Sequence, residues 1–258
     1  MARFDAGRML SGMETISSQQ KFWNDWNARS REQDISEVSR RQGEFIRDWL
    51  AQSGRRDLRI LDVGCGAGWL CPMLTPFGTV TGTDLSNEVL ERAQRRWPDV
   101  TFVAGDFATL PFEPRSFDVV TALEVLSHVE DQVAFLDRIA DLLVPDGMLL
   151  LATQNKPVLQ DYCNTAVPQP GQLRRWVDRD ELRSLAEERF AVEELVSATP
   201  VAHRGFRRLL TSGRVNALLQ PLIGNRLRDA LEARYWGWTL MLKARKRAPI
   251  VDVWPFDP

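Results

Sequence analysis

The chain has 258 residues, of which 44% are hydrophobic and 26% charged, and its formal net charge is −2. This composition is that of a soluble globular protein, with one domain and its appendages as the best expectation. It excludes a membrane-spanning protein, because no stretch reaches the roughly 18 uninterrupted apolar residues of a span, and three cysteines are too few for a disulfide framework. The N-terminus also lacks the order of a signal peptide, so we expect a cytoplasmic location.

The first part of the chain reads as helical. An aromatic run lies at 22–26, and apolar residues at helical spacing follow at Phe45, Ile46, Trp49 and Leu50. We therefore predict helices within residues 14–53, which form an N-terminal helical cap over 1–56. The main domain is expected over 57–258.

From residue 57 onward, apolar β-branched runs alternate with helical patterns. The predicted strands are 59–63, 79–83, 100–104, 117–123 and 147–153, and the predicted helices lie near 69–75, 87–96 and 132–143. Strands separated by helices pair in parallel through right-handed crossovers. The sequence thus predicts an α/β fold with a doubly wound sheet.

The first of these strands opens directly into a glycine-rich turn, in the run ILDVGCGAG at 60–68. Glycines let the backbone bend tightly and approach a ligand closely. A dinucleotide fingerprint would need its third glycine at Trp69, but here that glycine is Gly68. Asp62, two residues before the first glycine, suits a cationic ligand better than a pyrophosphate.

Two further acidic residues follow at equal intervals. Asp84 comes 22 residues after Asp62, and Asp106 comes 22 residues after Asp84, each at the end of a predicted strand. A carboxylate in the position of Asp84 can accept hydrogen bonds from both ribose hydroxyls, and Leu85 beside it can pack on an adenine. One strand-end aspartate is often only a helix cap, but three in register indicate a nucleoside site.

The run DVGCGAG at 62–68 resembles the first motif of the class I S-adenosylmethionine-dependent methyltransferases. The resemblance implies a seven-stranded, mostly parallel sheet with an antiparallel closing strand. It also implies S-adenosylmethionine as the cofactor and S-adenosylhomocysteine as the product, with Asp106 accepting from the adenine amine. The cofactor-binding residues that follow from it are Asp62, Gly64, Cys65, Gly66, Gly68, Asp84, Leu85, Asp106, Phe107 and Leu123.

The run EVLSHVED at 124–131, after the fourth strand, is similar to small-molecule methyltransferases that O-methylate quinone precursors and sugars. In those families a histidine at the position of His128 often faces the acceptor. A hydroxyl is a poor nucleophile until a base removes its proton, so we predict His128 as the general base; a packing role is the alternative. The quinone enzymes typically carry Glu where this chain has Ser127, and we therefore expect no metal site.

Two more residues are predicted to bind the acceptor. Trp69 follows the glycine turn directly, and Trp23 and Trp26 are further candidates to wall the site, because aromatic faces attract a sulfonium cation. Asn155, after the fifth strand, matches an amide often found near the acceptor pocket in the resembling family, although a capping role is equally compatible.

The predicted reaction is methyl transfer to a hydroxyl of a small molecule or sugar-like acceptor. N-methylation, which would not need His128, is the first alternative. A non-catalytic nucleoside-binding module, or a decarboxylase or cyclase that reuses the site, is the second. The acidic core disfavours nucleic acid as a partner, and the sequence does not specify the oligomeric state.

The last part of the chain departs from the alternating pattern. A loop at 157–171 precedes a helix near 178–188 and strands at 190–196 and 238–244, which form an antiparallel hairpin in the resembling family. Their connection over about 198–237 is far longer than a hairpin loop of roughly 2–5 residues. Its apolar stripe comprises Phe206, Leu209, Leu210, Leu218, Leu219, Leu222, Ile223, Leu227 and Leu231.

This helical insertion is also basic. Residues 204–247 contain eleven Lys or Arg and two acidic residues, a net charge of +9. Such a segment is expected first as a solvated cationic helix face; an anionic or lipid-like acceptor, or a peripheral contact with an anionic membrane, is the alternative. We favour a lid over the acceptor pocket, because the insertion joins the two closing strands.

Overall fold

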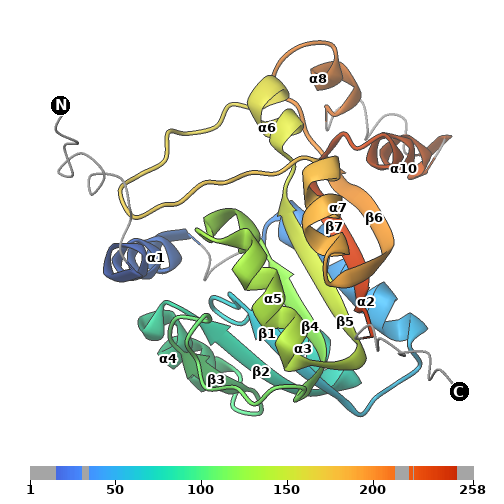
Figure 1. The fold of residues 1–258 in the computed structure, drawn as a ribbon. Helices are drawn as coiled ribbons and strands as arrows, with labels where there is room; N and C mark the ends of the chain where they lie inside the picture. The colour runs from blue at the N-terminus through green and yellow to red at the C-terminus, as the bar shows by residue number, and fades with distance from the viewer. Residues whose placement is uncertain (1–15, 31–34, 213–220, 223, 249–258) are drawn as a thin grey trace, which may run out of the picture.

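The structure, a computed structural model, describes residues 16–30, 35–212, 221–222 and 224–248. Its centre is a seven-stranded sheet in the order β3-β2-β1-β4-β5-β7-β6 (Figure 1). The strands are β1 Leu58–Val63, β2 Gly78–Asp84, β3 Thr101–Ala104, β4 Phe117–Leu123, β5 Leu143–Gln154, β6 Phe190–Pro200 and β7 Gly237–Lys246. Neighbouring strands pair in parallel except for β7, which runs antiparallel to β5 and β6. The predicted doubly wound sheet with an antiparallel closing strand is confirmed.

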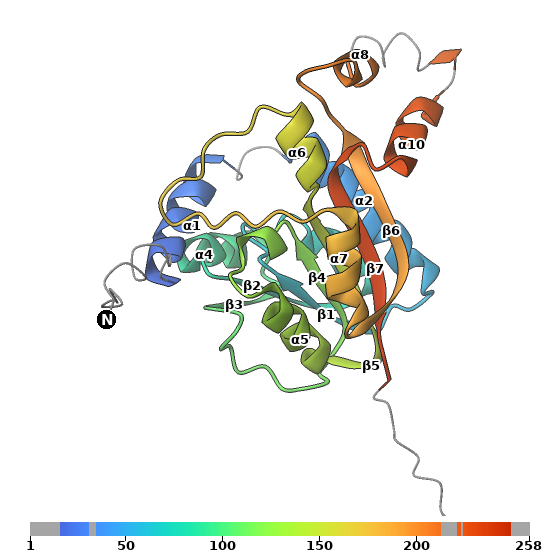
Figure 2. The ribbon, with the colours of Figure 1, turned by 45° about the horizontal axis from the view of Figure 1, so that its top comes forward.

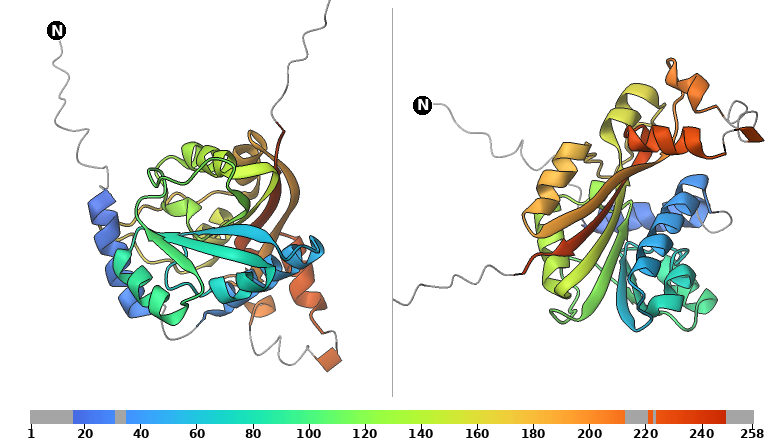
Figure 3. Two further views of the ribbon diagram at one scale, coloured as in Figure 1. Left: turned by 90° about the horizontal axis from the view of Figure 1, so that it is seen from below. Right: turned by 90° about the vertical axis from the view of Figure 1, so that its right-hand side faces the viewer.

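Helices cover both faces of this sheet (Figure 3). They are α1 Ile16–Ser30, α2 Glu37–Gln52, α3 Cys71–Leu74, α4 Asn87–Arg96, α5 Gln132–Leu142, α6 Lys156–Tyr162, α7 Arg179–Glu187, α8 Arg207–Leu210 and α10 Arg226–Ala233. Side-chain caps fix several of their starts: Ser36 accepts from an N–H of α2, Asp131 from one of α5, and Asp178 forms a capping box with Glu181 in α7. Such caps satisfy backbone donors that have no partner within the helix.

The apolar core has two halves, one on each face of the sheet. One half packs beneath α5 and α7 and includes Leu136, Ile139 and Leu182. The other packs beneath α2, α3 and α4 and includes Ile46 and Val89. Strands buried on both faces read as continuous apolar runs, which is why the sequence pattern locates them so directly.

Most element boundaries differ from the predictions by one to three residues, and three differences are larger or change the type of element. β5 begins at Leu143 because that residue already pairs with Phe117, and β6 continues to Pro200 along β7. Helix α6 lies within the predicted loop at 157–171. Pro157 sits in its first turn, where the missing N–H has no intrahelical acceptor to lose, so it marks the start of a helix and not a loop.

The strand order reverses between β1 and β4, which are neighbours although β2 and β3 follow β1 in the chain. The loops after β1 and β4 therefore leave in opposite directions, and a crevice opens at the carboxyl ends of these strands. Ligands of open α/β sheets bind at such a point.

Two segments lie over this end of the sheet: helix α1 and residues 163–178 between α6 and α7 (Figure 2). They touch each other at Gly171, whose conformation is left-handed with φ +84°; a Cβ there would lie 2.5 Å from the carbonyl oxygen of Ser18 in α1. Helix α1 is also tied to the loop after β2, because Gln20 donates to the carbonyl of Leu85 over 3.0 Å. The cover over the crevice is thus formed from two distant parts of the chain.

The described parts of the basic insertion, α8 and α10, lie on the far side of α6 from α1 (Figures 1 and 2). Helix α10 packs on β6 through the buried Leu231, and the buried Glu232 accepts from Arg41 and from the N–H of Thr199. Leu218, Leu219 and Ile223 of the predicted stripe lie outside the described residues, as do residues 1–15 of the predicted cap.

Candidate active site

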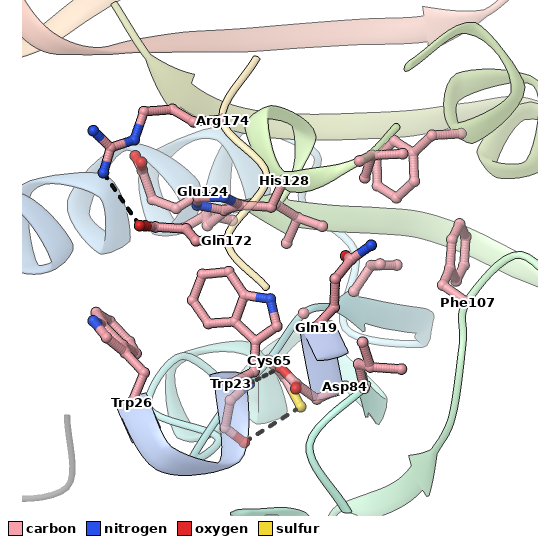
Figure 4. Close-up of a pocket in the computed structure, with 18 of the residues that line it drawn as sticks. Gln19, Trp23, Trp26, Cys65, Asp84, Phe107, Glu124, His128, Gln172 and Arg174 are labelled. Carbon is pink, nitrogen blue, oxygen red and sulfur yellow. Dashed lines mark hydrogen bonds between the residues drawn. The ribbon is translucent and has the colours of Figure 1, made fainter. Parts of the chain in front are cut away.

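A cavity of about 680 Å³ occupies the crevice at the carboxyl ends of β1, β2 and β4. Its volume is in the range of about 300–1,000 Å³ that small-molecule pockets have. The wall combines the glycine turn and strand ends with side chains of α1 and of residues 164–176. In Figure 4, Arg174 and Gln172 are drawn on one side of Trp23, and Asp84 on the other.

The glycine turn forms the floor of the cavity through Gly64 and Gly66, which have φ values of +69° and +54°. A Cβ on Gly64 would lie 2.1 Å from Cγ2 of Val125, so no larger residue fits. Gly68 does not line the cavity. Its φ is also positive, and it faces Trp97 and Phe102, so the third glycine serves packing.

Asp84 lies at the end of β2 on the cavity wall. One carboxylate oxygen accepts from the N–H of Gly66 over 2.9 Å and the other from the N–H of Ser86 over 2.8 Å. Burial raises the pKa of Asp84, and the two N–H donors oppose that shift. Since each carboxylate oxygen can accept two hydrogen bonds, the group retains capacity for two hydroxyl donors.

Asp62 is not part of the cavity wall, and the prediction that it contacts the cofactor finds no support in the geometry. Its buried side chain accepts from Thr121 of β4 over 2.6 Å, and the thiol of Cys71 lies 3.9 Å from its other oxygen. Desolvation raises its pKa to about 7. Asp62 therefore joins β1 to β4 below the site.

This raised pKa predicts a pH dependence of stability. The folded state holds a proton on Asp62 that the unfolded state has released, so the free energy of unfolding falls as the pH rises from about 4 to about 7. Asp62→Asn should reduce that fall by about 2 kcal/mol between pH 5 and pH 8. Urea unfolding at both pH values measures this difference, and Asp161→Asn, at an exposed position, is the control. If the free energy of unfolding depends on pH in the same way in Asp62→Asn and in the wild type, the raised pKa of Asp62 is refuted.

The remaining predicted cofactor residues come together on one side of the cavity. Cys65, Leu85, Asp106, Phe107 and Leu123 all line it. Asp106 accepts from the N–H of Ala108 over 3.0 Å, and the ring of Phe107 packs edge-on against Phe135 with centroids 5.3 Å apart. Burial raises the pKa of the Cys65 thiol well above its ordinary value, so this side chain is a neutral part of the wall.

His128 lies on the opposite part of the wall, in the 3-10 turn Leu126–His128 that follows β4. Its Nδ1 is 2.6 Å from the carbonyl oxygen of Leu173, and its ring meets that of Trp23 edge-on, with centroids 4.7 Å apart. A carbonyl oxygen can only accept, so Nδ1 carries a proton and Nε2 is the basic nitrogen of the neutral ring. This geometry permits the predicted role of a base.

Asn155 does not line the cavity, and its predicted contact with the acceptor is not supported. Its buried side-chain amide donates to the carbonyls of Tyr235 and Gly237, over 3.0 and 2.8 Å. The neighbouring Gln154 lines the cavity instead, because consecutive side chains of a strand point to opposite sides. Its Oε1 has no hydrogen-bond partner within the described ranges.

Asn155→Ala should therefore affect stability and not acceptor binding. Two carbonyls, that of Gly237 in a buried and that of Tyr235 in a partly buried position, lose their donor, which lowers the free energy of unfolding by about 1–3 kcal/mol. Chemical denaturation measures this loss, and KM for an acceptor should stay within about twofold of the wild type in the folded variant. A large rise in KM at unchanged stability would restore the original assignment.

Helix α1 supplies two tryptophans that the sequence suggested as wall residues, and one glutamine that it did not. Trp23, Trp26 and Gln19 line the cavity together with the predicted Trp69. In contrast, no described residue of 201–237 lines it, so the lid predicted from the insertion is not seen in this part of the chain. His203 of the insertion is exposed, and its Nδ1 accepts from the N–H of Asn164.

Neither a metal site nor a membrane span emerges from the described residues. No three His, Cys, Asp or Glu side chains among them are grouped so as to hold a metal ion. No described helix combines the length and the apolar character needed to cross a bilayer.

Comparison with known proteins gives a consistent family. Residues 61–151 match the family described as "Methyltransferase domain". This part of the chain, which holds the glycine turn and His128, is thus similar to a methyltransferase domain. The ubiquinone biosynthesis O-methyltransferase of Rhodopseudomonas palustris (strain TIE-1) is 35% identical over 145 residues, which cover 51% of this chain and 57% of that protein. The chain thus spans a little over half the length of the curated relatives it matches most strongly.

Solved structures share the methyltransferase fold. An S-adenosylmethionine-dependent methyltransferase from Mesorhizobium loti superposes with a TM-score of 0.56 at 21% identity, over 79% of this chain and 99% of that one. The [4+2]-cyclase SpnF superposes with a TM-score of 0.55 at 19% identity, over 80% and 81% of the two chains.

The family implies S-adenosylmethionine as cofactor, and the residues present fit it. The cavity offers the hydrogen-bond acceptors that a nucleoside needs: a carboxylate with remaining acceptor capacity at Asp84 and a second carboxylate at Asp106, above a glycine floor that excludes side chains. Thr83 adds a buried Oγ1 on the cavity wall that has no partner among the described residues.

Proposed function

We propose that this methyltransferase domain transfers a methyl group from S-adenosylmethionine to a hydroxyl of a small aromatic acceptor. The proposal rests mainly on the placement of His128 in the same cavity as Asp84. Its Nδ1 is hydrogen-bonded to the carbonyl of Leu173, and its ring contacts that of Trp23. The printed name of the Rhodopseudomonas relatives, O-methyltransferases of ubiquinone biosynthesis, supports a hydroxyl acceptor. The aromatic wall supports a flat acceptor.

The bound cofactor would supply an electrophilic methyl group on a sulfonium. Asp84, Asp106 and the glycine turn would hold its nucleoside part. Nε2 of His128 takes the proton of the acceptor hydroxyl, and the Leu173 carbonyl accepts from Nδ1–H before and after that transfer. Helix α1 and residues 164–176 exclude water and hold the acceptor in line.

The test is product formation by the purified protein. It is incubated with S-adenosylmethionine and, separately, with 3,4-dihydroxybenzoate, 3,4-dihydroxybenzamide, glucose and dopamine, and products are identified by mass spectrometry. A catechol that gains one CH₂ unit on oxygen supports the proposal. Methylation on the dopamine nitrogen alone would favour an N-methyltransferase, and cofactor binding by calorimetry without any product would favour a binding module.

A further inference from the structure

The side chain of Arg174 lines the cavity, and the groups of the described residues that it contacts there are all uncharged. It lies in the segment between α6 and α7, is partly buried, and lines the cavity close to Gln172 (Figure 4). One terminal nitrogen donates to the carbonyl of Ala166 over 2.5 Å, and the other to Oε1 of Gln172 over 3.3 Å. Its guanidinium also stacks over Trp176, 5.0 Å from the ring centroid.

No carboxylate lies within 4.0 Å of this guanidinium in the part of the chain that the structure describes. Desolvation lowers the pKa of Arg174 without an opposing charge. Five acidic side chains line the same cavity, and four of them have other partners: Asp84, Asp106 and Asp131 accept from backbone N–H groups, and Glu124 accepts from Gln42 and Thr239. The fifth, Glu130, forms no ion pair with Arg174 among the described residues. Placing a partly desolvated cation where it has no counter-charge costs free energy, and an ion pair with a bound anion offsets that cost.

The geometry points to an acceptor that carries a carboxylate, which Arg174 recognises. This inference rests on the proposed function and narrows its substrate class from small aromatic hydroxyl compounds to hydroxylated aromatic acids. A planar guanidinium pairs with a carboxylate through two parallel hydrogen bonds. Contacts to Ala166, Gln172 and Trp176 hold the group in place beforehand, so little side-chain entropy is lost on binding.

The first test compares two acceptors that differ only in charge. Calorimetry in the presence of S-adenosylhomocysteine gives the Kd of 3,4-dihydroxybenzoate and of its neutral isostere 3,4-dihydroxybenzamide. The wild type should bind the acid about 10- to 100-fold more tightly. Equal affinity for both compounds, or no binding of either, would overturn the inference without the need for any variant.

The second test removes the cation. Arg174→Gln should reduce the preference for the acid to within about twofold, while Arg174→Lys keeps part of it because the charge remains. Arg175→Gln is the matched control: Arg175 is exposed, donates to the carbonyl of Glu130 and does not line this cavity. A folded Arg174→Gln protein with the full preference would contradict the assignment.

The experiments distinguish a failure of the proposed methyl transfer from a failure of the role given to Arg174. If the acid binds through Arg174 but is never methylated, the role of Arg174 in recognition is supported and the proposed methyl transfer is contradicted. If the acid and the amide bind with equal affinity and are methylated with equal kcat/KM, the proposed methyl transfer is supported and the role of Arg174 is contradicted.

Discussion

His128→Ala is expected to lower kcat for a hydroxyl acceptor by roughly 10²–10⁴-fold, because the proton of the hydroxyl loses its acceptor. The affinity for S-adenosylmethionine should stay nearly constant, since the proposed nucleoside site consists of Asp84, Asp106 and the glycine turn and does not include His128. Single-turnover kinetics measure the rate, and calorimetry the affinity.

The chain offers its own control for this experiment, since its second histidine, His203, is exposed outside the cavity. His203→Ala should retain wild-type turnover. A near-normal rate for His128→Ala would instead point to an amine acceptor, or to a hydroxyl that is already ionised when it binds.

Asp84→Ala is expected to weaken cofactor binding by about 3 kcal/mol, more than a hundredfold in Kd. Two ribose hydroxyls would lose a charged acceptor, and the N–H groups of Gly66 and Ser86 would lose theirs. Calorimetry with S-adenosylhomocysteine measures the effect.

Asp161→Ala, at an exposed position on α6, is the control for Asp84 and should bind like the wild type. Asp84→Asn keeps one oxygen for an N–H of the loop and should fall between the two. Wild-type affinity in Asp84→Ala would place the ribose elsewhere.

The central strands could be predicted because they are apolar runs that are largely buried, and β4 was located to the residue. The strand-end acids were harder to interpret. Asp84 and Asp106 reach the cavity, but Asp62 points to Thr121 of β4. Sequence spacing places a residue at a strand end, but it does not say on which side of the sheet the side chain lies.

The part of the cavity wall around His128 could not be predicted from local sequence patterns. Arg174 and Gln172 belong to an irregular segment far along the chain, and Trp23, although a candidate for the wall, could not be placed beside His128 from the sequence. Their approach depends on tertiary contacts such as Gly171 against Ser18, which leave no periodic signal. Gln154 could have been found from strand alternation once Asn155 was assigned to the opposite side.

The hydrogen bond between His128 and Leu173 has a consequence for redesign. The acceptor of that bond is a main-chain oxygen, so it is independent of which side chain occupies position 173. The N–H of Arg175 fixes the same stretch to the carbonyl of Ser127 over 2.7 Å. A combinatorial library at positions 172 and 174 that preserves loop length can therefore change which acceptors are taken up while the imidazole keeps its tautomer. If His128 and Arg174 have the roles proposed for them, this one short loop governs acceptor selectivity through its side chains and the orientation of the base through its backbone, and the two can be altered independently.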